Sequence, residues 1–231
     1  MDDSKYTDLK YYQKYKERIE KVKAYVNAKH PQEVKEEYLR EYYRKFPLDM
    51  IYNRLLMIKT RGELVRLDPR MRPAQMEMLE IVQEHKENNK GLLWLIPKAR
   101  RQGVSTIIEA IIYCLTSQQE NQTATIIADE IKNSSNIFDM TKLYHETTPE
   151  IIKPEQKKSN AKELIFNKTH SLINIDTANK KTVGRSWEFL YIHLSECAFF
   201  GETTASIMLG IMQTLPEDMF SMIVLESNRR S

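Results

Sequence analysis

The sequence predicts an α/β fold in which helices flank a central, mostly parallel sheet, with a helical subdomain at the N-terminus. Three observations lead to this prediction. Helical periodicity dominates the first 60 residues. Strand and helix patterns alternate from residue 92 onward, which is typical of a parallel sheet. A basic loop with one glycine follows the first of these strands. We therefore divide the chain into a helical subdomain, residues 1–60, and an α/β core, residues 61–231.

Amphipathic helices account for the N-terminal subdomain. Apolar side chains recur every three or four residues between positions 8 and 27, with lysine and glutamate between them. Pro31 can begin a second helix, which Pro47 ends, and a third short helix is expected around 50–59. The many tyrosines of this region could stack on bases. Tyrosine at helical spacing is more typical of packing, so we assign these residues no binding role.

The core begins with a turn at Arg61-Gly62 and an extended segment at 63–67, after which Pro73 starts a helix that ends in the sequence Asn-Asn-Lys-Gly. The elements expected next are, in order, a strand at 92–96, a helix at 105–115, a strand at 123–128, a helix at 131–145, an antiparallel hairpin of 163–166 and 171–175, a strand at 188–194, a helix at 203–215 and a strand at 220–225.

Composition is that of a soluble globular protein. Hydrophobic residues make up 41% and charged residues 29% of 231 positions, enough for one substantial core. No apolar run approaches the roughly 20 residues that cross a bilayer, and the polar N-terminus is unlike a secretory signal, so an intracellular protein without a membrane span is expected. Cys114 and Cys197 lack metal-ligand spacing. The net charge of +3 neither requires nor excludes a local basic patch.

The segment LLWLIPKARRQGVST, residues 92–106, predicts a phosphate-binding loop. An apolar run breaks at Pro97 into a basic loop, and Gly-Val-Ser-Thr then starts a helix. Backbone N–H groups at a helix N-terminus bind anions, and glycine allows close approach. The usual loop ends in G-K-[ST], whereas Val104 stands in place of the lysine. The cation must therefore come from Lys98, Arg100 or Arg101. A plain helix cap is the alternative interpretation.

A Ser195-Glu196 pair stands at the end of the apolar strand 188–194, where open α/β sheets place ligand groups. In P-loop enzymes an aspartate at this Walker B position holds magnesium, and the next glutamate activates the attacking water. Ser195 replaces the aspartate, so we expect weaker affinity for magnesium and a larger contribution of Ser105 and the phosphates to metal binding. Glu196 is the candidate base. The alternative is a solvated strand end. If both motifs are real, the loop at Gly103 and Glu196 face each other across a triphosphate.

Four segments resemble the large terminase subunits of tailed phages, whose ATPase domains drive DNA packaging. They are RPAQ at 72–75, KARRQGVST at 98–106, HLSECAFF at 193–200 and VLES at 224–227. Terminases often place the loop cation upstream of G-x-[ST] and often read HLSE-x-A at the Walker B site, so this family tolerates both departures. The resemblance implies a P-loop NTPase fold of the ASCE, RecA-like type. It also implies an ATPase that hydrolyses ATP with Mg²⁺ to translocate double-stranded DNA into the procapsid.

The resemblance further implies individual roles. Gln75 would contact adenine, Ser105 and Ser195 would serve the metal, and Glu196 would orient the water. Ser227 would belong to the motif that couples hydrolysis to movement. The nucleotide-binding loop would comprise Lys98, Arg100, Arg101, Gln102, Gly103, Val104, Ser105 and Thr106. The alternatives are a solvent-facing helix residue for Gln75 and a strand-end hydroxyl for Ser227.

Arg185, in the turn Gly-Arg-Ser before the Walker B strand, is the arginine-finger candidate, because ring-forming family members use an arginine from this turn on a neighbour's γ-phosphate. The alternatives are a solvated turn arginine and, with the neighbouring Lys180 and Lys181, a contact to DNA phosphates. The implied partners are double-stranded DNA, the portal protein and the small terminase subunit. We expect a homo-oligomeric ring on the portal or a monomer in isolation, located in the host cell cytoplasm and transiently on the procapsid.

The family's C-terminal nuclease domain is not expected, because the sequence ends almost at the coupling motif. Two other functions stay open. A helicase-like nucleic-acid translocase shares the glutamine, loop and carboxylate, although Val104 and Ser195 count against it. A catalytically weak nucleotide- or DNA-binding module is suggested by those same two positions.

Overall fold

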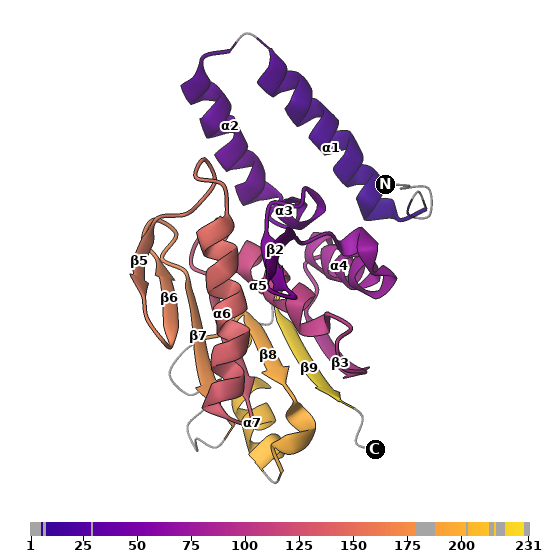
Figure 1. The fold of residues 1–231 in the computed structure, drawn as a ribbon, viewed down its shortest axis with the longest axis vertical. Coiled ribbons are helices and arrows are strands. Elements are labelled where there is room, and N and C mark those ends of the chain that lie inside the picture. Colours follow the sequence, from indigo (N-terminus) through magenta and orange to yellow (C-terminus); the bar gives the residue numbers. More distant parts are fainter. Residues whose placement is uncertain are drawn as a thin grey trace.

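The computed structural model describes residues 6, 8–28, 30–178, 188–201, 203–212, 215 and 220–228. Its main feature is a seven-stranded sheet of order β3-β9-β8-β4-β7-β6-β5 (Figure 1). The strands from β3 to β7 are mutually parallel, and β6 and β5 extend the sheet by antiparallel pairing. The predicted fold class, a mostly parallel sheet flanked by helices with helices at the N-terminus, is confirmed.

Most elements lie where the sequence predicts them. The strands of the sheet are β3 (Leu92–Lys98), β4 (Thr123–Ala128), β5 (Gln156–Ser159), β6 (Glu163–Phe166), β7 (Leu172–Thr177), β8 (Tyr191–Ser195) and β9 (Met222–Asn228). The helices are α1 (Lys10–Asn27), α2 (Gln32–Lys45), α3 (Asp49–Tyr52), α4 (Pro73–Glu87), α5 (Val104–Gln118), α6 (Ile131–Thr147) and α7 (Thr203–Met212), with short 3-10 turns η2 (Pro69–Met71) and η3 (Cys197–Phe199).

Strand alternation gives the sheet two different faces. Tyr191 and Val224 belong to the core beneath α5 and α6, whereas Ile192 and Ile223 pack with α7 on the opposite face. Because successive side chains of a strand point to opposite faces, every second residue of β8 after Tyr191 also lies on the α5 face. His193 and Ser195 are these residues.

The helices α1 and α2 lie at the end of the molecule opposite α7 (Figure 1). Tyr12, Tyr15 and Tyr52 form mutual ring contacts and are buried, so the packing interpretation of the N-terminal tyrosines is confirmed for these residues. Arg18 of α1 binds the buried Asp49 through two hydrogen bonds of 2.9 and 2.7 Å. Packing and ion pairs therefore hold α1 against the core, since Lys14 Nζ also lies 2.6 Å from Glu87 Oε2 of α4.

The prediction of a helix at 50–59 is wrong beyond Tyr52. Helix α3 ends at that residue, and a hairpin of β1 (Met57–Thr60) and β2 (Glu63–Arg66) follows. Arg61 and Gly62 both have positive φ, 49° and 87°, which is the two-residue turn that suits antiparallel strands. The hairpin gives the main chain of 57–60 hydrogen-bond partners that helical periodicity does not anticipate. The predicted subdomain boundary after residue 60 falls at this turn and stays a prediction.

Three further differences from the predicted elements concern strands of the sheet. Strand β3 continues through Pro97 to Lys98, because it is an edge strand where the missing N–H of proline interrupts no ladder. Strand β5 was not predicted. The last strand continues to Asn228, so Glu226 and Ser227 lie within it and not after it. Among the residues that the structure describes, no helix is long and apolar enough to cross a membrane.

Candidate functional site

The loop between β3 and α5 is bent at Gly103 and held by the start of α4. Gly103 has φ 73°, which favours glycine, and a Cβ there would lie 2.6 Å from Gln75 Nε2 and displace that amide. The amide of Gln75 donates to the Gly103 carbonyl oxygen at 2.7 Å, and Arg72 Nη1 donates to the Arg101 carbonyl oxygen at 2.8 Å. No side chain caps the first N–H groups of α5.

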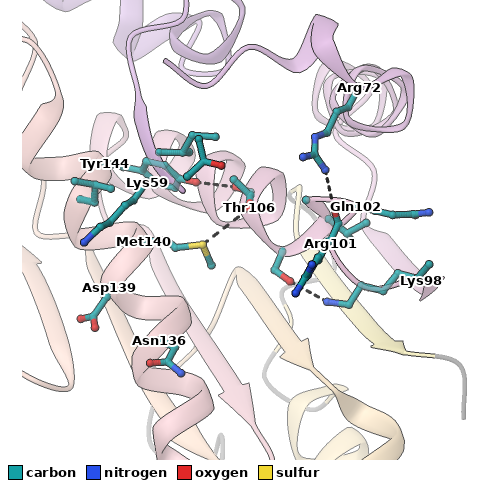
Figure 2. A pocket seen from close by; sticks show the side chains of 17 residues that line it. Lys59, Arg72, Lys98, Arg101, Gln102, Thr106, Asn136, Asp139, Met140 and Tyr144 are labelled. Carbon is teal, nitrogen blue, oxygen red and sulfur yellow. Dashed lines mark hydrogen bonds between the residues drawn. The ribbon is translucent and has the colours of Figure 1, made fainter. Parts of the chain in front are cut away.

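A cavity of about 500 Å³ opens beside this loop, a volume typical of small-molecule sites (Figure 2). Figure 2 shows Lys98 and Arg101 on one side of the cavity and Asn136 and Asp139 of α6 on the other. The lining residues of the loop and of the start of α5 are Lys98, Ala99, Arg101, Gln102, Gly103, Val104, Ser105 and Thr106. Strand β1 and helix α6 supply much of the remaining wall.

Lys98 is the loop cation that turns inward. Its side chain is 11% exposed, and Nζ donates to Ser105 Oγ at 2.9 Å. Arg101 also lines the cavity but is exposed, and Arg100 is exposed without lining it. Val104, at the position of the usual lysine, is 5% exposed and packs into the core. Within the loop, the cation closest to the start of α5 is therefore Lys98, at the end of β3, while Lys59 of β1 and Arg72 line the cavity from outside the loop.

A buried carboxylate lies at the centre of the polar contacts. Glu226 of β9 has no exposed surface, and its Oε1 accepts hydrogen bonds of 2.8 Å from both Ser105 Oγ and Ser195 Oγ. Its Oε2 lies 2.5 Å from Lys98 Nζ. The two serines that sequence reasoning assigned to the metal therefore meet at one oxygen of a third residue.

His193 joins Glu226 to a second buried acid, Glu109 of α5. The ring Nε2 lies 3.3 Å from Glu226 Oε1, and Nδ1 lies 2.5 Å from Glu109 Oε1. Burial lowers the pKa of His193, but the adjacent carboxylates of Glu109 and Glu226 outweigh burial and raise it. Burial raises the pKa of Glu226, but His193 and Lys98 outweigh burial and lower it. Both shifts favour an imidazolium beside a carboxylate.

Glu196 follows β8 with a left-handed backbone conformation, φ 56° and ψ 38°. Its carboxylate accepts from the Asn228 main-chain N at 3.2 Å and from Asn228 Nδ2 at 2.8 Å. Lys98 Nζ lies 3.8 Å from Glu196 Oε1. The expected proximity of the basic loop and Glu196 is thus met, while their roles toward a nucleotide stay predictions.

Three other residues were predicted for the site, and they do not line the cavity or lie outside the described residues: Ser227, Gln75 and Arg185. The Ser227 hydroxyl accepts from the Ala198 N–H at 3.3 Å and so joins β9 to η3 directly after Glu196. Gln75 is 4% exposed and, within the described part of the chain, is not a lining residue of the cavity. Its adenine contact stays a prediction. Arg185 lies outside the described residues.

No protein-family model and no curated protein matches the sequence. The structure is similar to the crystal structure of the HK97 bacteriophage large terminase, with a TM-score of 0.60 and 15% sequence identity. The two chains share a fold. The match covers 80% of this chain and 37% of the terminase chain, so this chain spans well under half of that protein. At this identity the similarity concerns the fold alone.

Sequence reasoning missed two parts of the site in this terminase-like fold. Glu226 lies within the segment VLES, and the sequence predicts no role for it, because a glutamate after an apolar run resembles a solvated strand end. The wall formed by β1 was missed because that segment was expected to be helical. Ile58, Lys59 and Thr60 line the cavity from this strand. The Arg61-Gly62 turn signal was the one available indication that a hairpin stood here.

Proposed function

We propose that the chain is an ATPase domain of the large-terminase type, which binds ATP with Mg²⁺ at the cavity and hydrolyses it to translocate double-stranded DNA into a procapsid. One observation carries the proposal. A glycine-bent loop at a helix N-terminus, an inward lysine and two acids meet beside a cavity of suitable size. The fold likeness to a phage large terminase supports the same conclusion.

Each group has a chemical task in this proposal. The N–H groups at the start of α5 and the Lys98 ammonium bind phosphate oxygens. The hydroxyls of Ser105 and Ser195, which lie against the Glu226 carboxylate, are oxygen donors of the kind that Mg²⁺ prefers. When bound, Mg²⁺ neutralises charge on the phosphates. Glu196 orients the attacking water, and Arg185 acts on the nucleotide of a neighbouring subunit.

The proposed partners are double-stranded DNA, the portal protein and the small terminase subunit, with a ring of copies on the procapsid in the host cell cytoplasm. Their support is the likeness to the HK97 large terminase fold and the motif resemblance of the sequence. Ser227 would transmit hydrolysis to movement, since its hydroxyl links β9 to the turn after Glu196.

The test measures nucleotide affinity and Mg²⁺-dependent phosphate release by the purified chain. Glu196→Gln should retain binding and lose turnover. Lys98→Met should weaken nucleotide binding by about tenfold to a hundredfold, the worth of hydrogen bonds to a charged group, and by more than Arg100→Met or Arg101→Met does. Turnover by the isolated chain is expected to be slow, because the arginine comes from a neighbour, so affinity is the primary measurement.

Absence of nucleotide binding would refute the proposal, as would hydrolysis that Glu196→Gln leaves untouched. Phosphate release that disappears in Lys98→Met excludes a module that only binds nucleotide. Strand displacement on a forked duplex would instead favour a helicase-like translocase.

A further inference from the structure

We infer that Glu226 of β9 supplies the carboxylate of the magnesium site, in place of the acid that β8 lacks. The inference rests on the proposed function and deepens it, because it assigns a residue to the metal that the motifs do not. Its basis is the contact set of Glu226 on the α5 face of the sheet.

Strand register puts Glu226 beside the position where an acid is missing. Ser195 of β8 pairs with Glu226 of β9, so both side chains leave the sheet on the same face as neighbours. Strand β9 lies between β8 and β3, one strand nearer to the loop. A longer glutamate side chain on this nearer strand reaches the first turn of α5, where Ser105 Oγ lies 2.8 Å from its Oε1.

The charge of Glu226 needs a cation. A fully buried carboxylate is stable only when it is paired. In the free protein one partner is His193, which Glu109 fixes from behind, and the other is the Lys98 ammonium, 2.5 Å from Oε2. Lys98 also lines the cavity. When Lys98 turns to a phosphate, Glu226 loses a positive neighbour, and a divalent cation at Ser105 restores the balance.

The donor set agrees with this assignment. Mg²⁺ is usually held by one or two carboxylates, together with waters and substrate phosphates. Glu226, Ser105 and Ser195 offer one carboxylate and two hydroxyls around a single point. Glu196, the other acid of the site, is engaged by both nitrogen groups of Asn228. The two acids thus have different roles: Glu226 binds the metal, and Glu196 orients the attacking water.

The experiment measures calorimetrically how much Mg²⁺ strengthens ADP binding, as the ratio of affinities in Mg²⁺ and in EDTA. The unmodified chain and the control Glu146→Gln, an exposed residue of α6 that does not line the cavity, should show strengthening of about tenfold or more. Glu226→Gln should lose most of the strengthening, and because the ratio compares each variant with itself, this result does not depend on the variant's affinity for ADP in EDTA. Circular dichroism verifies that each variant is folded.

Equal strengthening in Glu226→Gln and the unmodified chain would overturn the inference and leave the proposed function standing, as would ADP binding that Mg²⁺ does not affect. No ADP binding by the unmodified chain in either condition refutes the proposed function itself. If Glu226→Gln does not fold, a crystal structure of the unmodified chain with ADP and Mg²⁺ decides. We expect a Glu226 oxygen at about 2.1 Å from the ion or one water away. An ion without Glu226 in either shell overturns the inference.

Discussion

A single histidine connects the candidate site to the helices that cover it. His193 has no exposed surface and lies between Glu109 and Glu226, which are equally buried. Thr141 of α6 donates to the far oxygen of Glu109 at 2.9 Å. With Lys98, the cluster holds two acids and two cations, so its net charge is balanced. Charges that are buried in this way stabilise the fold only as a complete set.

Replacement of His193 by alanine should therefore strongly destabilise the fold. His193→Ala leaves Glu109 and Glu226 without the cation between them, and we expect the free energy of unfolding to fall by about 3–5 kcal/mol. Urea denaturation followed by circular dichroism measures the change. His170→Asn is the control, since His170 is exposed and asparagine tolerates its left-handed backbone, φ 54°, and it should stay within about 0.5 kcal/mol. A comparably small loss in His193→Ala would contradict a charged cluster.

Among the elements, helix α1 is attached to the core by an ion pair with a buried carboxylate of α3. The Arg18 guanidinium binds both carboxylate oxygens of Asp49, which is 1% exposed, and Tyr42 Oη donates to the same carboxylate at 2.5 Å. Paired hydrogen bonds between guanidinium and carboxylate are among the strongest polar contacts in proteins. This ion pair joins α1 to α3, and Tyr42 adds α2 to it.

Arg18→Ala should accordingly loosen α1. The buried Asp49 loses its cation, and we expect a loss of about 3 kcal/mol in the free energy of unfolding. Amide hydrogen exchange should also accelerate along α1, while the central strands stay protected. Lys21→Ala, at an exposed position of the same helix, is the control and should change neither quantity. Unchanged exchange in α1 after Arg18→Ala would show that this ion pair does not hold the helix, and that tyrosine packing and the contacts with α4, such as Lys14 with Glu87, are sufficient.

At the scale of the whole molecule, stability should fall in mild acid. Burial, aided by the charge of Lys153, lowers the pKa of His145 from 6.5 to about 4. Between these values the unfolded chain binds a proton that the folded chain does not, so stability decreases as pH falls below about 6.5. Each pH unit in this window costs up to about 1.4 kcal/mol.

Urea denaturation at a series of pH values measures the slope. His145→Gln removes the titrating ring and should flatten the dependence between about pH 6 and pH 4.5, whatever it does to stability at neutral pH. An equal slope in both chains would mean that His145 is not the group responsible.

The sequence was sufficient for every strand of the sheet except β5 and for the proximity of the basic loop and Glu196, because periodicity and motif order are local signals. It was insufficient where partners distant in the chain decide. Segment 57–60 pairs with β2 instead of continuing a helix. Glu226 becomes buried because Ser105, 121 residues earlier, and Lys98 reach it. No pattern around Glu226 distinguishes a central carboxylate from a solvated strand end.

The line of contacts from Glu226 through His193 and Glu109 to Thr141 also constrains how such a chain can diverge. A neutral residue at 193 leaves two acids in repulsion, and a neutral residue at 109 leaves the imidazolium with one counter-ion instead of two. Substitutions at positions 109, 193 and 226 are consequently tolerated as a set and not singly. Relatives that lack the histidine are expected to have lost a carboxylate with it, so that covariation among the positions would record the electrostatic balance of the core.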